Sequence, residues 1–408
     1  MAQGAVGANI LSNQVTIGGS NISAFGDLIV ANHTPVIQLD FVYGINTQTG
    51  SSSVNTTGVA DINASRLRLQ TGVGAAGAAT YNSARIARYR QGQGMTARFT
   101  AVWTNSAASS TQVVGMGNTQ VGYFFGYNGT AFGLSIRNGG SDSWVVQTAW
   151  NGDKCDGTGG SGFNWDKTKG NVMMIRYPFL GYGAITYWVQ NPITGNWILC
   201  HTIQYPNSSA SVQMSNPSFP FFANVTNAGS TTNILMYVGS VGVFISGIRD
   251  YLQQVYCTDN TKAAVTAETC IFSIRNCNTY NGVTNSGIIR LRSISMAYNN
   301  AVNGFGVLRV RKGATLGGSP AYAAVNGTTG DNGVTLTAAN SIASVDTAAT
   351  TSTGGFYQFN LNCGNVNNAT LDVSPYLLYI NPGEILTFGC FATVSGGFQV
   401  AANWNEDI

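Results

Sequence analysis

One glycine-rich loop concentrates the residues of this chain that could do chemistry. The segment WNGDKCDGTGGSGFNWD, residues 150–166, carries Asp153, Asp156 and Asp166. Carboxylate oxygens on a flexible loop are ligands that Ca²⁺ accepts, and the order Asn-x-Asp-x-x-Asp-Gly is faintly like a calcium loop. The segment lacks the later bidentate Glu, and neighbouring lysines could neutralise the carboxylates instead. The sequence therefore leaves two interpretations, a calcium site and a loop of Asx turns, and it favours the turns.

Three of the seven tryptophans, Trp144, Trp150 and Trp165, lie in or just before the same loop. Exposed aromatic rings beside Asn and Asp stack on sugar rings while the polar groups hydrogen-bond the hydroxyls, which would make a glycan-binding surface. The alternative is that the three rings fill a core or a subunit contact, and this alternative is preferred. Exposure of the loop in the folded protein distinguishes the two.

A small basic and aromatic cluster lies in RIARYRQGQG, where Arg85, Arg88 and Arg90 surround Tyr89. Nucleic-acid binding would need a far larger basic face. Arg and Tyr are enriched at protein interfaces. The cluster is therefore predicted to lie at a contact between subunits.

Catalytic constellations are missing from the sequence. The two histidines, His33 and His201, lie in strand-like text, where a hydrogen-bonded structural role is the usual one, and no G-x-S-x-G, Walker or H-E-x-x-H motif occurs. Glycan cleavage would require two carboxylates roughly 5 to 10 Å apart, and no obvious pair stands out. We predict a protein that is not an enzyme, has no catalytic residue and needs no cofactor beyond the calcium considered above.

Composition narrows the classes of partner. Charged residues are 9% of the chain, against roughly 25% in ordinary soluble domains, and the net charge is only +3. So weak a charge predicts no attraction to nucleic acid, and no apolar run reaches the length of a membrane helix. The N-terminus lacks the pattern of a secretory signal, so synthesis in a cytoplasm is expected. The seven cysteines form no C-x-x-C pair, and buried thiols are favoured over a disulfide among Cys257, Cys270 and Cys277.

The periodicity is that of an almost all-β protein. Alternating β-branched and aromatic runs recur every ten to fifteen residues, whereas helical spacing is scarce. The segment GYFFGYNGTAFGLSIRNGG, residues 122–140, is predicted to form a hairpin with a type I′ turn at Asn128-Gly129. Its internal glycines, Gly126 and Gly133, are expected to mark bulges or the close approach of another backbone.

Four parts are predicted along the chain. Residues 1–65 read as an N-terminal arm and loop that docks on a neighbouring subunit, and residues 66–250 as a two-sheet antiparallel jelly roll of the concanavalin type. Residues 251–284 read as a connector, with the one stretch that could hold a short helix. Residues 285–408 make a second, smaller jelly-roll-like sandwich.

Several segments resemble virion proteins of tailed phages and other large double-stranded DNA viruses. They are ARIARYRQGQGMTARFTAVWT, GYFFGYNGTAFGLSIRN, MMIRYPFLGYGAITYWVQNPITGNWILCHTI and the C-terminal LLYINPGEILTFGCFATVSGGFQVAANWNEDI. The resemblance covers residues 66–250 and 285–408. It implies an exterior structural component of the virion, in a tail, neck, fibre or capsid-surface position, that forms a symmetric homo-oligomer.

The leading hypothesis is therefore a non-enzymatic virion structural protein. Its expected partners are copies of itself, with a trimer among the symmetries considered, other virion proteins and a host-surface glycan. The alternative is a soluble carbohydrate-binding protein of the lectin type. A glycan-cleaving enzyme on the same sandwich is the least supported of the three, because sandwich folds host many functions and this sequence shows no carboxylate pair.

Overall fold

The computed structural model describes residues 8–11, 14–17, 33–247, 255–300, 303–325, 341–364, 367–376 and 378–407. These residues form antiparallel strands and two short 3-10 turns, without an α-helix, which confirms the predicted all-β class. No helix of the described residues is long and apolar enough to cross a membrane. The chain divides into two compact units, Met1–Arg249 and Asp250–Ile408. Each unit holds an antiparallel β-sandwich.

The first sandwich is built from two large sheets. One sheet has seven strands in the order β12-β11-β10-β9-β16-β7-β4. The other has the order β15-β14-β13-β8-β17-β6-β5, with β3 also paired to β17. The elements of this unit are β1 (Ala8–Leu11), β2 (Gln14–Ile17), β3 (His33–Asp40), β4 (Gly50–Asn55), β5 (Val59–Asn63), β6 (Arg66–Gln70), β7 (Ala78–Ala87), β8 (Met95–Trp103), β9 (Ser110–Gly117), β10 (Gly122–Asn128), β11 (Ala131–Asn138), β12 (Ser141–Val146), η1 (Gln147–Ala149), β13 (Asn171–Tyr177), β14 (Ile185–Gln190), β15 (Trp197–Ile203), β16 (Phe219–Asn227) and β17 (Leu235–Ser246).

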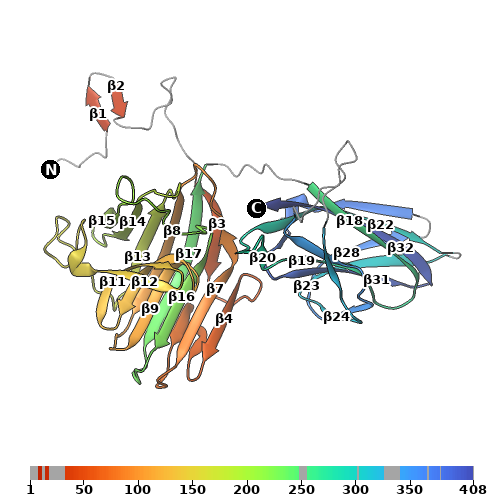
Figure 1. Ribbon diagram of the computed structural model, residues 1–408, viewed down its shortest axis with the longest axis horizontal. Coiled ribbons are helices and arrows are strands. Elements are labelled where there is room, and N and C mark those ends of the chain that lie inside the picture. The colour runs from red at the N-terminus through yellow and green to blue at the C-terminus, as the bar shows by residue number, and fades with distance from the viewer. Residues whose placement is uncertain are drawn as a thin grey trace. The chain divides into compact units, whose positions relative to one another are not determined.

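Strict alternation of side chains gives each sheet one buried face. In β14, for example, Ile185, Tyr187 and Val189 are buried while their neighbours are half-buried, as expected when successive residues point to opposite faces. The buried faces of the two sheets share one core, in which the ring of Phe99 from β8 meets that of Phe125 from β10 at a centroid distance of 6.3 Å. The two layers are visible in Figure 1.

Successive strands of this sandwich change sheet. Strand β7 lies in the seven-stranded sheet, β8 in the other and β9 back in the first, and β16 and β17 again lie in different sheets. Crossings of this kind between two antiparallel sheets are typical of jelly rolls. The predicted fold class is therefore confirmed at the level of sheets and crossings.

The predicted hairpin at residues 122–140 forms, but its glycines do not mark bulges. Strand β10 pairs with β9 and β11 in unbroken register. On the outer face, a β-carbon at Gly117 would lie 2.6 Å from Phe124 Cζ, which shows that the Phe124 ring lies flat across its glycine neighbours. At Gly126 and Gly133 a β-carbon would strike the backbone of Gln112 and Val145, so the close approach of another backbone is confirmed there.

The turn of that hairpin is shifted by one residue from the prediction. Asn128 pairs with Ala131, so Gly129 and Thr130 are the central residues. Only Gly129 has a positive φ, of 61°, whereas a type I′ turn needs two and a type II′ turn needs one at the first central position. The next turn, between β11 and β12, has two central residues with a positive φ, Gly139 and Gly140.

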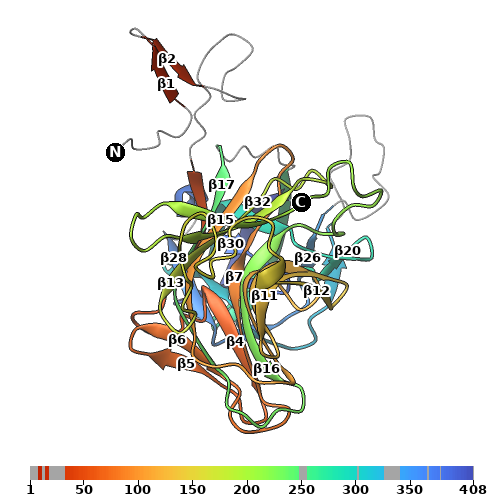
Figure 2. The ribbon, with the colours of Figure 1, turned by 90° about the vertical axis from the view of Figure 1, so that its left-hand side faces the viewer.

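The predicted N-terminal arm is too long. Residues from His33 onward belong to the sandwich, because β3 pairs with β17, β4 with β7 and β5 with β6. Figure 2 shows β4 beside β7 at the edge of its sheet. The loop-like composition of residues 46–65 misled the prediction, since β4 is a sheet edge whose side chains after Gly50 are all exposed and, apart from Val54, polar. Most of residues 1–32 lie outside the described residues.

The second unit is also a two-sheet sandwich. One sheet has the order β18-β32-β22-β29, with β30 paired to β22, and the other has the order β25-β26-β19-β31-β23-β28. Both contribute to one core. Its elements are β18 (Val255–Val265), β19 (Thr269–Asn276), β20 (Thr279–Tyr280), β21 (Val283–Thr284), β22 (Ile288–Asn299), β23 (Phe305–Lys312), β24 (Thr315–Gly317), β25 (Tyr322–Ala324), β26 (Ala343–Asp346), β27 (Thr351–Thr353), β28 (Phe356–Gly364), β29 (Asn367–Asp372), η2 (Ser374–Tyr376), β30 (Tyr379–Ile380), β31 (Ile385–Ala392) and β32 (Gly396–Asp407).

The predicted connector, residues 251–284, contains strands of this second sandwich. Strand β18 pairs with β32, and β19 lies between β26 and β31 with five consecutive buried side chains. The hydrophobic sequence CIFSI of β19 is typical of a central strand that is covered on both faces. The second sandwich therefore starts some thirty residues before the predicted boundary at residue 285.

All seven cysteines are free thiols. Five are buried, whereas Cys257 is exposed and Cys277 is half-buried. Cys155 and Cys200 bring their sulfur atoms within 3.8 Å of each other in the first core. The alternative of a disulfide among Cys257, Cys270 and Cys277 is therefore not realised.

Candidate functional site

The tryptophans do not form the predicted glycan surface. Trp150 and Trp165 are 3% and 2% exposed and belong to the core of the first sandwich. The Trp165 ring packs edge-on against Phe132 at 5.1 Å, and Trp150 Nε1 donates to the carbonyl of Val145. Trp144 lies half-buried on β12 against the small cluster around Phe124. The preferred interpretation, rings that fill a core, is therefore confirmed for Trp150 and Trp165, and the tentative glycan-stacking role is wrong for both, because the loop folds inward and uses them to close the sandwich.

The three aspartates of the same loop turn away from a shared site. Asp153 accepts the backbone N–H groups of Cys155 and Ser161, each at 2.8 Å. Asp156 and Asp166 each accept the backbone N–H and the hydroxyl of the threonine two residues later. Within the described part of the chain no three His, Cys, Asp or Glu side chains converge on a position for a metal ion. The hydrogen bonds fit the interpretation that the sequence favours, a loop of Asx turns, and the three aspartates do not form the alternative calcium site.

The electrostatics of the loop agree with this geometry. The hydrogen bond from the Thr158 hydroxyl lowers the pKa of Asp156, and that from the Thr168 hydroxyl lowers the pKa of Asp166. Burial works against ionisation of Asp153, but the backbone N–H groups of Ser161 and Cys155 lower its pKa overall. Hydrogen bonds to the charged form satisfy these carboxylates without a cation.

Part of the predicted interface cluster makes contacts inside the first unit. The Tyr89 ring packs against Phe179 at a centroid distance of 5.0 Å, and the Tyr89 hydroxyl accepts the backbone N–H of Leu180. Arg85 is exposed, whereas Arg88 and Arg90 are half-buried. A role of Arg85, Arg88, Tyr89 and Arg90 in a subunit contact stays a prediction.

The two histidines have no catalytic surroundings. His201 is 8% exposed, and its Nδ1 accepts the backbone N–H of Asn151 at 3.0 Å. Burial lowers the pKa of His201, which favours the neutral ring that this hydrogen bond requires. His33 is exposed at the start of β3, with its ring edge-on to Phe244. The structural role predicted for His201 is confirmed.

A pocket of about 420 Å³ opens where β3 ends and the chain crosses to β4. Its lining comes from the end of β3 and from the loop that follows: Gln38, Leu39, Asp40, Tyr43, Gly44, Ile45, Asn46 and Thr49. Phe41 anchors the loop, because its ring is buried and packs edge-on against Tyr81 at 5.4 Å. The loop then closes on the Asn46 carbonyl, which accepts the N–H groups of Thr49 and Gly50 at 3.0 Å each.

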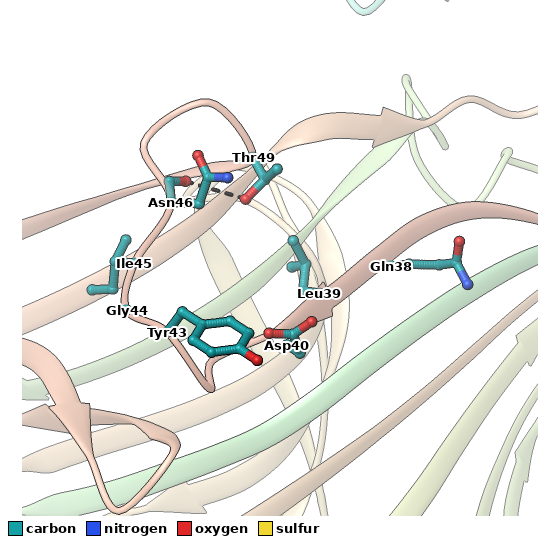
Figure 3. Close-up of a pocket in the computed structure, with 8 residues that line it drawn as sticks. All are labelled: Gln38, Leu39, Asp40, Tyr43, Gly44, Ile45, Asn46 and Thr49. Atoms are coloured by element: carbon teal, nitrogen blue, oxygen red, sulfur yellow. Dashed lines mark hydrogen bonds between the residues drawn. The ribbon is translucent and has the colours of Figure 1, made fainter.

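Tyr43 is the outstanding side chain of this pocket. It is 99% exposed, the largest exposed fraction among the large hydrophobic side chains described. Figure 3 shows its ring beside the carboxylate of Asp40, with Asn46 and Thr49 on the opposite side of the hollow and Leu39 between them. The site therefore presents a free aromatic face next to oxygen and nitrogen groups that can hydrogen-bond a ligand.

Most of the polar groups in the pocket have capacity to spare. Within the described residues, the carboxylate of Asp40 accepts one long hydrogen bond, 3.3 Å, from the backbone N–H of Val42. Asn46 Oδ1 accepts the N–H of Gln48, which leaves its amide N–H₂ group unused. The side chain of Gln38 and the hydroxyl of Tyr43 make no hydrogen bond within the part of the chain described. A ligand with several hydroxyls would find both donors and acceptors here.

Sequence reasoning missed this pocket. The residues LDFVYG, 39–44, lie within the segment predicted to be an N-terminal arm and loop. The phase of Leu39 and Phe41 would place Tyr43 inward too, so the one signal for its exposure is the glycine and the polar loop that follow it.

No known protein family matches the chain, and no curated protein matches it in sequence. Several solved structures are similar to part of the chain at low identity. The Emp47p carbohydrate recognition domain is 10% identical and has a TM-score of 0.34, with 53% of this chain and 97% of that chain covered. A lectin from Bauhinia forficata in complex with GalNAc is 12% identical and has a TM-score of 0.33, with 53% and 100% covered.

A glycoside hydrolase family protein from Mycobacterium thermorestibile is 10% identical, with a TM-score of 0.36 and with 51% of this chain and all of that chain covered. At such identities and TM-scores none of these matches assigns a function to this chain. We therefore infer the function from the residues of the pocket.

Proposed function

We propose that the first unit binds carbohydrate, without transforming it, in the pocket between β3 and β4. The observation that carries the proposal is Tyr43, an aromatic ring exposed to 99% at the mouth of a pocket with underused polar groups. An aromatic face contacts the apolar C–H face of a sugar ring, and the flanking carboxylate and amides hydrogen-bond its hydroxyls. The pocket volume lies in the range of small-molecule sites.

The same residues argue against hydrolysis. Cleavage of a glycosidic bond uses a pair of carboxyl groups at opposite sides of the bond. Among the residues that line the pocket, Asp40 is the one carboxylate, and it lies on the exposed end of β3. A single exposed carboxylate can hold a hydroxyl, but it cannot act as acid and base on both sides of a bond.

A glycan array with the full chain tests the proposal through Tyr43. We expect Tyr43→Ala to weaken binding at least tenfold, or about 1.4 kcal/mol, because the sugar loses its stacking face. Tyr43→Phe keeps the ring and is expected to remain within about threefold of the wild type. Because Tyr43 makes no contact with the core, both variants should keep the melting temperature of the wild type.

Two results would contradict the proposal. One is the absence of glycan binding by the wild-type chain, and the other is unchanged binding by Tyr43→Ala. Hydrolysis of a bound oligosaccharide would contradict the non-enzymatic part alone.

Carbohydrate binding is compatible with the virion hypothesis. Exterior virion proteins that contribute to host attachment meet surface glycans, so the pocket would supply that contact. The location in a virion, the homo-oligomer and the other virion proteins as partners stay predictions that rest on the sequence resemblance. By itself, the pocket supports the alternative hypothesis of a soluble lectin-like protein.

A further inference from the structure

The outer face of the eight-stranded sheet carries positive charge beside the pocket. Arg98 on β8 and Arg176 on β13 are both exposed. In the register of these strands, Arg98 is opposite Met174 and Arg176 is opposite Thr96. The two arginines are thus diagonal neighbours on one face, roughly 7–8 Å apart at the backbone, within reach of a common ligand.

Neither arginine is neutralised by a carboxylate in the described part of the chain. This sets them apart from Arg68, which pairs with Asp61, and from Arg137, which pairs with Asp142 at 2.8 Å. Two rings hold Arg98 in place instead: its guanidinium carbon lies 5.5 Å from the Phe244 ring centroid and 5.9 Å from that of Trp197. Such contacts orient the planar group while they leave its N–H donors free.

This charged face is continuous with the pocket. Gly242 on β17 is opposite Arg98 on one side and opposite Gln38, which lines the pocket, on the other. Since neighbouring strands are about 4.8 Å apart, Arg98 and Gln38 lie roughly 10 Å apart across a glycine without a side chain. The half-buried Phe244 ring lies over this glycine, since a β-carbon at Gly242 would be 3.0 Å from Phe244 Cε2. An oligosaccharide of two or more rings would therefore reach both groups across the Phe244 ring.

We propose that the glycan bound by the first unit is acidic, with a carboxylate or sulfate held by Arg98 and Arg176. The inference rests on the proposed carbohydrate binding and names the class of its ligand. Each arginine fork can donate two parallel hydrogen bonds to one such group. The other charged or titratable groups of this face are His33, which is exposed at the start of β3, Asp40 in the pocket, Tyr237 on β17, and Arg66, Arg68 and Asp61 on β6 and β5. Asp40 is opposite Ser240, two residues along β3 from Gln38, so it is farther from Arg98 than Gln38 is.

Paired glycans on one array provide the test: acidic oligosaccharides, bearing sialic acid, uronic acid or sulfate, beside their neutral counterparts. We expect wild-type protein to bind the acidic members at least about tenfold more tightly. Arg98→Gln and Arg176→Gln should each remove most of this preference and leave binding of the neutral members unchanged. Arg98→Lys should retain part of it, because the charge stays but the fork is lost.

Lys169→Gln is the matched control. Lys169 is an exposed cation in the loop before β13, and its loss changes the net charge by the same amount. This variant should keep the full preference for acidic glycans. Equal loss in Lys169→Gln and Arg98→Gln would mean that net charge alone attracts the ligand, and this would overturn the inference.

The remaining outcomes separate this inference from the proposed function. Binding of neutral glycans that depends on Tyr43 but not on Arg98 would overturn the acidic ligand and leave carbohydrate binding in place. Absence of all glycan binding would overturn both. Competition by inorganic sulfate alone, without any contribution from the sugar, would point to a free-anion site and would also overturn the inference.

Discussion

At the scale of single residues, Phe124 shows how this protein uses glycine. Its side chain is fully buried, yet it lies on the outer face of the seven-stranded sheet with Phe222 and Val113. The ring is covered by Arg137, whose guanidinium carbon is 5.0 Å from the ring centroid and which is fixed by Asp142. The neighbouring glycines provide the flat floor that this ring needs.

Replacing one glycine of that floor should therefore destabilise the first unit. In Gly122→Ala the new β-carbon would lie 2.5 Å from Phe124 Cζ and close to the backbone of β9. We expect a loss of about 2–3 kcal/mol in the free energy of unfolding, because overpacking forces the ring or the strand to move. Urea titration of the full chain measures this loss.

Gly170→Ala is the control for this prediction, since its β-carbon would meet nothing within 4 Å. Its expected effect is below about 0.5 kcal/mol. Equal stabilities of the two variants would show that Phe124 does not need the space.

For the loop at 150–166 the sequence favoured core tryptophans and Asx turns, as the structure has them, but it left the opposite directions of the side chains open. Trp and Asp in one polar, glycine-rich segment are equally compatible with an exposed binding loop and with a lid over the core. What decides is whether the rings point inward, and this depends on partners distant in sequence, such as Trp103 and Phe132 for Trp165. Single-sequence patterns hold no information on such contacts.

At the scale of elements, β32 positions the start of β26 through a buried carboxylate. Glu406 is 4% exposed. It accepts hydrogen bonds from the Ser341 hydroxyl, the Ile342 backbone N–H and Trp404 Nε1. Burial raises the pKa of Glu406 above its ordinary value of 4.5, although these hydrogen bonds work in the opposite direction.

This raised pKa predicts a pH dependence of stability in the second unit. A carboxyl whose pKa is higher in the folded chain than in the unfolded chain binds its proton more tightly when folded. Its contribution to the free energy of unfolding is therefore complete below about pH 4.5 and is lost as pH rises through the folded value. The stability of wild type relative to Glu406→Gln should therefore fall from pH 4 to pH 7.

Urea titrations at several pH values measure this difference, with tryptophan fluorescence as the signal. Trp404 is the one tryptophan after residue 250, so the second unit has its own reporter. Stability curves of wild type and Glu406→Gln that run parallel over pH 4–7 would contradict the assignment.

Strands with a hydrophobic face were predictable, and polar edge strands were not. Alternation located the interior strands of both sandwiches because one face of each is buried. Two strands lie at sheet edges and contribute little to the core. They are β4, with the sequence GSSSVN, and β18, with the sequence VYCTDNTKAAV. Their pairing is set by backbone hydrogen bonds, which leave no hydrophobic pattern in the sequence.

At the scale of the whole molecule, the chain that forms the two sandwiches carries few charged residues. Charged residues make up 9% of the chain, so most exposed polar groups are amides and hydroxyls. Against this neutral background, Arg98 and Arg176 are two exposed cations on one face of the first unit that form no ion pair within the described residues. Weak long-range steering is expected from such a surface, and ligand selection depends on groups that make direct contact.

The most direct test of carbohydrate binding in this pocket is hydrogen exchange of the full chain, with and without the tightest glycan found on the array. The account predicts that the glycan slows exchange in the peptides that cover residues 38–49, and that Tyr43→Ala abolishes this protection. Protection confined to other segments, with residues 38–49 unchanged, would contradict the central claim.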